Sequence, residues 1–144
     1  MSTTEGHAEG NNQPVTRLGI GPDTVVLELG YDDGCDEELR SAIEARTAHL
    51  LVDEEPDDVV DLVLMWWRAD DGDLVDALVD AMTMLADGGV IWLFTPKSGR
   101  PGHVEPSDIG EAAPTAGLQQ TSTLSAARDW TGSRLVARKS GGRR

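Results

Sequence analysis

The sequence predicts an α/β domain built on a mostly parallel sheet that a terminal antiparallel hairpin closes. Residues 58–96 carry the first observation, because they read as strand, helix and strand in succession. The nearly continuous apolar runs Val59–Trp66 and Val90–Phe94 are typical of strands covered on both faces. The second observation is the alternating pattern of residues 120–126 and 133–138, which is typical of a hairpin. Parallel strands joined by a helix require a right-handed crossover, so the central unit implies this fold class.

The helix of the central unit is predicted from apolar residues at three- and four-residue spacing, which share one face: Leu74, Val75, Leu78, Val79, Met82 and Leu85. Acidic residues take the opposite face. Gly88 and Gly89 follow, and paired glycines are typical of a left-handed helix end. We therefore expect the helix to continue to this glycine pair.

The rest of the chain divides into a lead, one domain and a tail. Residues 1–16 have almost nothing to bury and are predicted to be a disordered lead, residues 17–139 form a single domain, and residues 140–144 are a flexible basic tail. Within the domain, residues 24–29 read as the first strand, and Asp36 is a natural N-cap for the helix that follows. We expect about five to six strands in all.

Two further segments have less regular patterns. Residues 48–53 are apolar enough for a strand, but only about six residues remain to return across the sheet, so we expect a short or irregular edge. The crossover helix that normally follows such a strand is missing. Later in the chain, residues 107–113 predict a short helix that Pro114 stops.

The charge balance restricts the partners. The chain has 144 residues, with 26 acidic against 12 basic side chains and a net charge of −14. Such a field repels phosphates and anionic lipids, so we expect neither nucleic acid nor a membrane as a partner. A single cysteine excludes a disulfide framework and a cysteine metal cluster, which suits the reducing cytoplasm. We expect no metal site.

The first strand and its loop resemble the class I S-adenosylmethionine-dependent methyltransferase fold, a Rossmann-like fold. Glu28, Gly30 and Gly34 match the acidic and outer glycine places of that family's ExGxGxG loop, and Asp32 occupies the middle glycine place. Asp53 lies about 20 residues downstream, at the spacing of a ribose-binding acid. The resemblance implies that these residues hold the cofactor. A side chain at the middle place departs from the pattern, because the backbone must approach the ligand closely there.

Longer phrases resemble one small actinobacterial family, the domain of unknown function 3052. They include LGYDDG, LVDEE, VDLVLMWWR, DGDLVDALVDA, GVIWLFTPK and GHVEPSDI, and they run from Val26 to the C-terminus. This resemblance implies a lineage but no activity.

The acidic loop 32–34 follows the first strand at the edge where α/β proteins bind ligands. Its carboxylates disfavour a phosphate and favour a cationic ligand such as a sulfonium, whereas the simpler interpretation makes them turn and cap residues. Cys35 lies at the helix start, but the surrounding acids oppose a reactive thiolate.

Trp66 and Trp67 end the second main strand and point to opposite faces of the sheet. We expect one indole to pack under a helix and the other to line the crevice, where it would stack on a base or receive a cation. We assign Trp66 to the cofactor group. The alternative is that both are core-rim residues, with Arg68 paired to Asp70 or Asp71.

Lys97, Arg100 and His103 place much of the scarce positive charge in one loop on the ligand side. Together they are a candidate anion-binding group for a carboxylate or phosphate, or His103 acts as a base near neutral pH. The alternative is a loop that Glu105 and Asp108 tie down.

For function, the missing third-strand unit, Asp32 and the small size favour a non-catalytic descendant of the fold, a pseudoenzyme. We expect a cytoplasmic binding, interaction or regulatory module with a protein partner, no cofactor and no catalytic residue. The alternative is an S-adenosylmethionine-dependent methyltransferase of a small molecule or protein, with Trp66 or His103 near the methyl group. An exposed hairpin edge predicts a monomer or weak homodimer, which Arg134 and Arg138 oppose.

Overall fold

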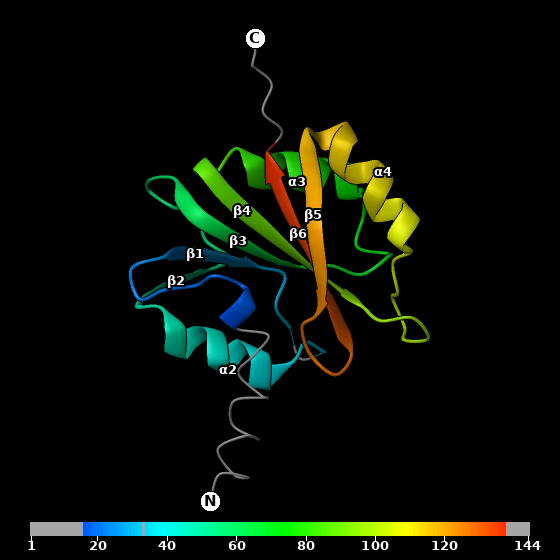
Figure 1. Ribbon diagram of the computed structural model, residues 1–144, viewed down its shortest axis with the longest axis horizontal. Coiled ribbons are helices and arrows are strands. Elements are labelled where there is room, and N and C mark those ends of the chain that lie inside the picture. The colour runs from blue at the N-terminus through cyan, green and yellow to red at the C-terminus, as the bar shows by residue number, and fades with distance from the viewer. Residues whose placement is uncertain (1–15, 33, 138–144) are drawn as a thin grey trace, which may run out of the picture.

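A computed structural model describes residues 16–32 and 34–137, and its centre is a six-stranded sheet. The sheet order is β2-β1-β3-β4-β6-β5, in which the first four strands are mutually parallel and β6 is antiparallel to both β4 and β5 (Figure 1). The expected mostly parallel sheet with a terminal antiparallel hairpin is thus confirmed. The predicted lead and tail fall almost wholly outside the described residues.

The four parallel strands are β1 (Val25–Leu29), β2 (His49–Val52), β3 (Val60–Trp66) and β4 (Leu85–Pro96). The short edge strand expected after the first helix does form: β2 pairs with β1 over four residues. The chain then returns to β3 through residues 53–59 without a helix. β3 is buried at every position but one, as its apolar run predicts.

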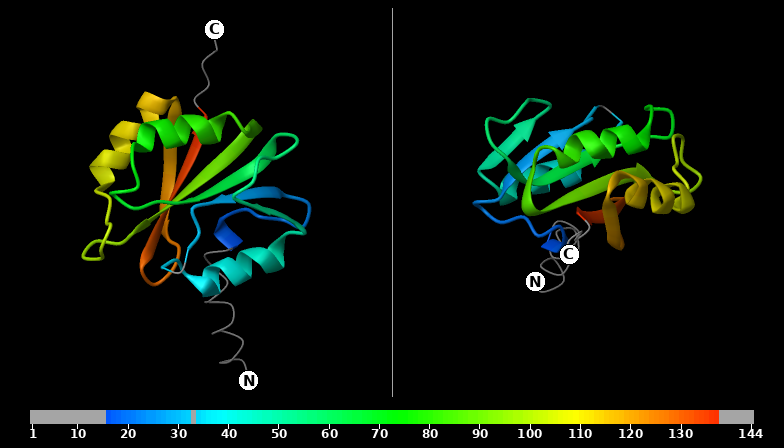
Figure 2. Two further views of the ribbon diagram at one scale, coloured as in Figure 1. Left: turned by 180° about the vertical axis from the view of Figure 1, so that it is seen from behind. Right: turned by 90° about the horizontal axis from the view of Figure 1, so that it is seen from above.

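Helices cover the two faces of the sheet separately. α2 (Glu37–Arg46) packs Leu39 and Ile43 on one face, together with Leu18 and Ile20 from the segment before β1. α3 (Leu74–Met82) and α4 (Pro106–Ala116) lie together on the opposite face (Figure 2). In the described residues, no helix is long and apolar enough to cross a membrane.

The end of α3 differs from the prediction. The helix ends at Met82, and the Val60 N–H already donates to the Met84 carbonyl oxygen at 2.8 Å. Leu85 pairs with Val60, and an irregular register between Val60 and Leu62 absorbs the extra residues. Gly88 has the positive φ expected of it, 79°, but it lies inside β4. The helical spacing of apolar residues extends beyond the end of α3 because Leu85 packs against the same core from β4.

The C-terminal elements also shift from their predicted bounds. α4 continues through Pro114 to Ala116, and Gly117, which is left-handed with φ 94°, caps it. Because proline has no N–H, the helix lacks the hydrogen bond that residue 114 would donate to the carbonyl oxygen four residues earlier. The hairpin consists of β5 (Leu118–Ser125) and β6 (Trp130–Ala137), so Trp130 to Gly132 belong to β6 and not to the turn. Because β6 is the inner strand, Arg134 is not on the sheet edge, and Arg138 lies outside the described residues.

Candidate functional site

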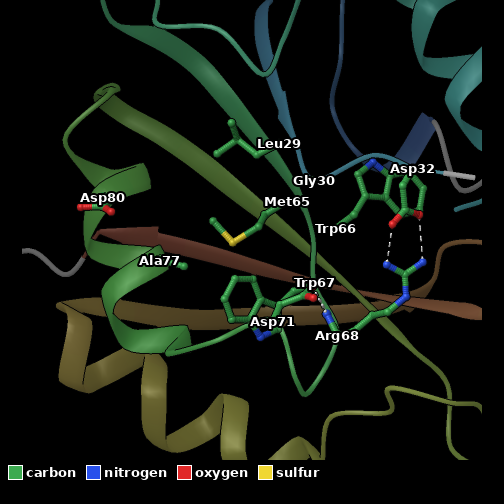
Figure 3. Close-up of a pocket in the computed structure, with 10 residues that line it drawn as sticks. All are labelled: Leu29, Gly30, Asp32, Met65, Trp66, Trp67, Arg68, Asp71, Ala77 and Asp80. Carbon is green, nitrogen blue, oxygen red and sulfur yellow. Dashed lines mark hydrogen bonds and ion pairs between the residues drawn. The ribbon is translucent and has the colours of Figure 1, made fainter. Parts of the chain in front are cut away.

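The carboxyl ends of β1, β2 and β3 lie at one edge of the sheet and bring together residues far apart in sequence. Leu29 is paired with Met65, and Glu28 with Val52. A cleft of about 410 Å³ opens there, between these strand ends and α3 (Figure 3). We call it the strand-end cleft; its lining residues are Leu29, Gly30, Asp32, Met65, Trp66, Trp67, Arg68, Asp71, Ala77 and Asp80.

A two-pronged ion pair between Asp32 and Arg68 crosses this edge. Arg68 Nη1 and Nη2 donate to Asp32 Oδ2 and Oδ1 at 3.0 and 3.1 Å, as Figure 3 shows. The guanidinium lies so close to the loop that a Cβ on Gly34 would be 2.5 Å from Nη2, and a Cβ on Gly102 would meet the Arg68 stem at 2.9 Å. Arg68 thus bridges the loops that follow β1 and β4. The expected pairing of the Arg68 side chain with Asp70 or Asp71 is wrong: Asp71 accepts only the Arg68 backbone N–H, at 2.9 Å.

The same ion pair shifts the pKa values of its two groups in opposite directions. The hydrogen bonds from Arg68 hold the pKa of Asp32 below its ordinary value and raise the pKa of the Arg68 guanidinium. Both groups are therefore charged across the range in which the protein would be studied. Since more than half of the Asp32 side chain is exposed, solvent screens this attraction and the pair fixes geometry more than it adds stability.

Three N–H groups in the described part of the loop after β1 already donate within the chain. Gly30 donates to Asp53 Oδ1 at 3.1 Å, Gly34 donates to Asp32 Oδ1 at 2.9 Å, and Cys35 donates to the Asp32 carbonyl oxygen at 3.0 Å. Gly30 needs its left-handed φ of 82°, and a Cβ there would be 2.6 Å from the Trp66 carbonyl oxygen. Asp53, the acid predicted at the end of the second strand, is itself left-handed, with φ 49°.

Beneath the loop, Glu28 is buried against two partners. Its carboxylate accepts the Trp66 Nε1–H at 3.0 Å and lies 2.8 Å from Arg40 Nη2, while only 1% of its surface is exposed. Burial raises the pKa of Glu28, and the bonds from Trp66 and Arg40 oppose that rise. Arg40 also lies over the Tyr31 ring, 4.6 Å from its centroid. This cluster is internal and holds β1, β3 and α2 together.

The two tryptophans do lie on opposite faces. The Trp66 indole is buried among Tyr31, Phe94 and Trp130, with no flat face left for a base. The Trp67 side chain is half-buried, packs against the core on the α3 side and lines the strand-end cleft (Figure 3). Cys35 is buried beside Asp32, and burial raises the pKa of its thiol to about 11, as suits an inert thiol.

The three loop residues predicted to bind an anion have separate partners. Lys97 Nζ contacts Ser125 Oγ at 2.6 Å, and Arg100 Nη2 pairs with Asp129 at 2.6 Å. His103 Nδ1 lies 2.9 Å from the Pro96 carbonyl oxygen, and its Nε2 lies 3.7 Å from Glu105. None of the three lines the strand-end cleft. Anion binding by this loop remains a prediction.

Sequence reasoning missed Arg40 and Arg68 as the partners of the two important carboxylates. Arg68 follows directly after β3, so its place at the sheet edge was readable, but its partner lies 36 residues away. For Arg40 the signal was its place four residues after the Asp36 cap, one turn into α2. Both pairings depend on which strands are neighbours, and no local pattern contains that information.

Solved structures of S-adenosylmethionine-dependent methyltransferases resemble this fold. One from Thiobacillus denitrificans, in complex with S-adenosyl-L-homocysteine, has a TM-score of 0.61 at 11% identity over 88% of this chain and 91% of that chain. A putative type 11 methyltransferase from Sulfolobus solfataricus has a TM-score of 0.61 at 13% identity, over 83% and 87% of the two chains. At such identities the likeness shows the fold alone, and the expected Rossmann-like, methyltransferase-type fold is confirmed.

Sequence comparison gives much closer relatives. Uncharacterized proteins of Mycobacterium tuberculosis and Mycobacterium bovis are 52% identical over 124 residues, which is 86% of this chain and 78% of each relative. The family model described as protein of unknown function (DUF3052) matches residues 15–139. The chain therefore belongs to the DUF3052 family, whose fold here is that of the Rossmann-like methyltransferases.

Proposed function

We propose that this protein is a non-catalytic binding module of the cytoplasm, a pseudoenzyme that keeps the methyltransferase fold and works through a protein partner. The observation that carries the proposal is the Asp32–Arg68 ion pair, which lies across the loop where the fold resemblance places the cofactor's amino-acid part. A ligand on that loop would have to displace a guanidinium that contacts Gly34.

The residues of the loop do not fit S-adenosylmethionine in this arrangement. An amino acid carboxylate needs free N–H donors, yet the N–H groups of Gly30, Gly34 and Cys35 donate to acceptors within the chain. Asp32 adds a negative charge where that carboxylate would lie. Trp66, expected to stack on a base, is 1% exposed. These features support a loop that completes its own hydrogen bonding.

The alternative, an S-adenosylmethionine-dependent methyltransferase, is favoured by one observation. Asp53 ends β2 beside Gly30, at the place that the resemblance gives to the ribose-binding acid, and its side chain is solvent-exposed. Under this alternative Glu28, Gly30, Gly34 and Asp53 would surround the cofactor after Arg68 had moved. The preferred proposal, by contrast, assigns no residue of the described site to methyl transfer.

Calorimetric titration with S-adenosylmethionine and S-adenosylhomocysteine tests the proposal. We expect no binding heat from the native protein, because the ion pair and the occupied N–H donors exclude the ligand. Two variants accompany it, Asp32→Gly and Asp32→Gly/Arg68→Ala, of which the second removes the side chains that cross the loop. Dissociation constants near 1 μM for the native protein would overturn the proposal and make the methyltransferase alternative the working one.

Binding by the double variant alone would support the role given to the ion pair. An Arg100→Ala variant is the matched control, because Arg100 pairs with Asp129 away from this loop. It should behave as the native protein does.

A further inference from the structure

The strand-end cleft has an apolar and aromatic interior, which the Asp32–Arg68 ion pair does not fill. Leu29, Met65 and Ala77 form its walls with the Trp67 indole, while the guanidinium of Arg68 points away toward Asp32 (Figure 3). Its volume of about 410 Å³ is in the range of sites that enclose a small ligand or a single large side chain. A ligand here would therefore contact carbon atoms over most of its surface.

The charge around this interior is negative. Three carboxylates line the cleft, those of Asp32, Asp71 and Asp80, against one guanidinium. That guanidinium is bonded to Asp32, so it offers no free positive charge to an incoming ligand. Asp80 lies on α3 beyond Ala77, and the Asp71 carboxylate lies beside Trp67, where it accepts the Arg68 backbone N–H (Figure 3). An apolar site with an aromatic wall and acidic surroundings favours an organic cation over an anion or a neutral ligand.

The surface beside the cleft indicates that the cation belongs to a polypeptide. α3 presents Val79, which is 41% exposed, next to Asp80, and Asp76 lies one turn earlier on the same helix. A free small molecule in the cleft would leave this apolar and acidic helix surface uncovered. A basic chain segment would cover it, and the net charge of −14 would steer such a segment toward the protein.

We propose that the strand-end cleft receives an arginine or lysine side chain from a basic segment of the protein partner. The aliphatic stem would pack on Leu29, Met65 and Ala77, and the charged end would lie near Trp67 and Asp80. This inference rests on the proposed function, since it names the class of partner that the non-catalytic module binds. It concerns the α3 side of the sheet edge, whereas the cofactor test concerns the loop on Gly30 and Gly34.

Short capped peptides that differ only in one central side chain test the cation requirement. The probes are alanine pentapeptides with arginine, lysine or the neutral isostere citrulline at the centre, titrated into the ¹⁵N-labelled full chain. We expect saturable shifts of the Trp67 indole N–H and the Ala77 amide with arginine and lysine, and binding at least about tenfold weaker with citrulline. Equal binding of citrulline, or no saturable shift up to about 20 mM arginine peptide, would overturn the proposal.

Two single substitutions separate the site from general electrostatic attraction. Asp80→Asn removes a lining carboxylate and should weaken the arginine peptide by about three- to tenfold. Glu38→Gln removes the same charge from α2, on the other face of the sheet, and should leave the affinity unchanged. Equal losses from both variants would overturn the proposal, as would shifts centred on residues 55–59, which precede the opposite end of β3.

Failure of the peptide experiment can be told apart from failure of the proposed function, because the two ligands would shift different amides. S-adenosylmethionine bound at the β1 loop would shift the Gly34 and Asp53 amides, which do not line the cleft, whereas the arginine peptide would shift Trp67 and Ala77. Cofactor binding with no peptide binding would overturn both proposals. Cofactor binding alongside charge-dependent peptide binding would overturn only the first.

Discussion

Glu28 is the residue at which burial and charge oppose each other most directly. Its carboxylate is 1% exposed and has one cationic partner, Arg40, whose own side chain is 20% exposed. Burial raises the pKa of Glu28 above its ordinary value, so the folded protein holds that proton more tightly than the unfolded chain does. The contribution of Glu28 to stability is therefore full below its unfolded pKa and is lost as the pH rises through the folded pKa.

The Glu28→Gln variant should remove this pH dependence. Gln still offers an oxygen to Trp66 Nε1–H, so the free energy of unfolding of the wild type minus that of the variant should fall as the pH rises above about 4.3. The slope is at most about 1.4 kcal/mol per pH unit, the value for one proton. Urea unfolding at several values between about pH 4 and pH 7, where a carboxyl group with a raised pKa titrates, measures this slope.

Asp32→Asn is the counterpart with the opposite sign. Arg68 lowers the pKa of Asp32, so the stability that Asp32 contributes is present above its unfolded pKa and is lost as the pH falls through its folded pKa. The wild-type advantage over Asp32→Asn should thus grow with rising pH. The same slope for both variants would contradict the assignment.

Gly30 is fixed by two independent constraints. Its φ of 82° disfavours any Cβ, and a Cβ there would also be 2.6 Å from the Trp66 carbonyl oxygen, which is backbone and cannot rotate away. We expect Gly30→Ala to lower the free energy of unfolding by more than about 2 kcal/mol. Gly99→Ala is the matched control, because Gly99 has φ 86° and no atom within 4 Å of the added Cβ.

Chemical denaturation of both variants measures the difference. Gly99→Ala should cost only the conformational part, about 1 kcal/mol. Equal losses for the two variants would mean that the Trp66 carbonyl oxygen does not constrain the loop.

At the scale of elements, α2 begins where the candidate site ends. Asp36 Oδ1 accepts the Leu39 N–H at 2.8 Å, and Glu37 and Glu38 follow in the first turn, where negative charge is favoured. This cap fixes the direction of the helix that carries Arg40 to Glu28. The start of α2 therefore affects both stability and the buried ion pair.

Asp36→Ala should lower the free energy of unfolding by about 1 kcal/mol, the usual cost of losing an N-cap. Asp36→Asn keeps an acceptor oxygen and should recover most of that loss. Thermal unfolding followed by circular dichroism compares the two. No difference between the Ala and Asn variants would show that the side-chain bond to Leu39 contributes nothing.

The elements also show what the sequence could and could not predict. The runs that became β1, β3 and β4 were predicted because a strand buried on both faces has an unmistakable composition. The end of α3 was placed too late because Leu85 is apolar in either conformation and only its pairing with Val60 decides. In the site, the positions of Gly30, Asp32 and Asp53 followed from strand ends, but the Asp32–Arg68 bond depends on side-chain directions across two loops.

At the scale of the whole molecule, acidic side chains greatly outnumber basic ones. With 26 acidic and 12 basic residues, the acidic side chains repel one another more strongly in the folded chain than in the expanded one, and few described acids have ion-pair partners. Salt screens this repulsion, since the screening length falls from about 30 Å at 0.01 M to about 8 Å at 0.15 M. The fold should therefore gain stability from moderate salt.

Raising sodium chloride from about 0.01 M to 0.3 M should raise the melting temperature by a few degrees. Differential scanning calorimetry at constant pH measures it, with sodium sulfate avoided because sulfate stabilises by exclusion. A falling melting temperature would mean that the ion pairs of Arg40, Arg68 and Arg100 outweigh the general repulsion.

The one-sided pairing of β2 has a consequence for hydrogen exchange. β2 has four residues, hydrogen bonds to β1 along one side only, and continues into the exposed residues 53–55. Such an edge opens locally at a lower free energy than the strands inside the sheet. Because Asp53 accepts the Gly30 N–H, opening of this edge also releases the loop after β1. We therefore expect the amide hydrogens of Gly30 and β2 to exchange as one unit, while β3 and β4 remain folded.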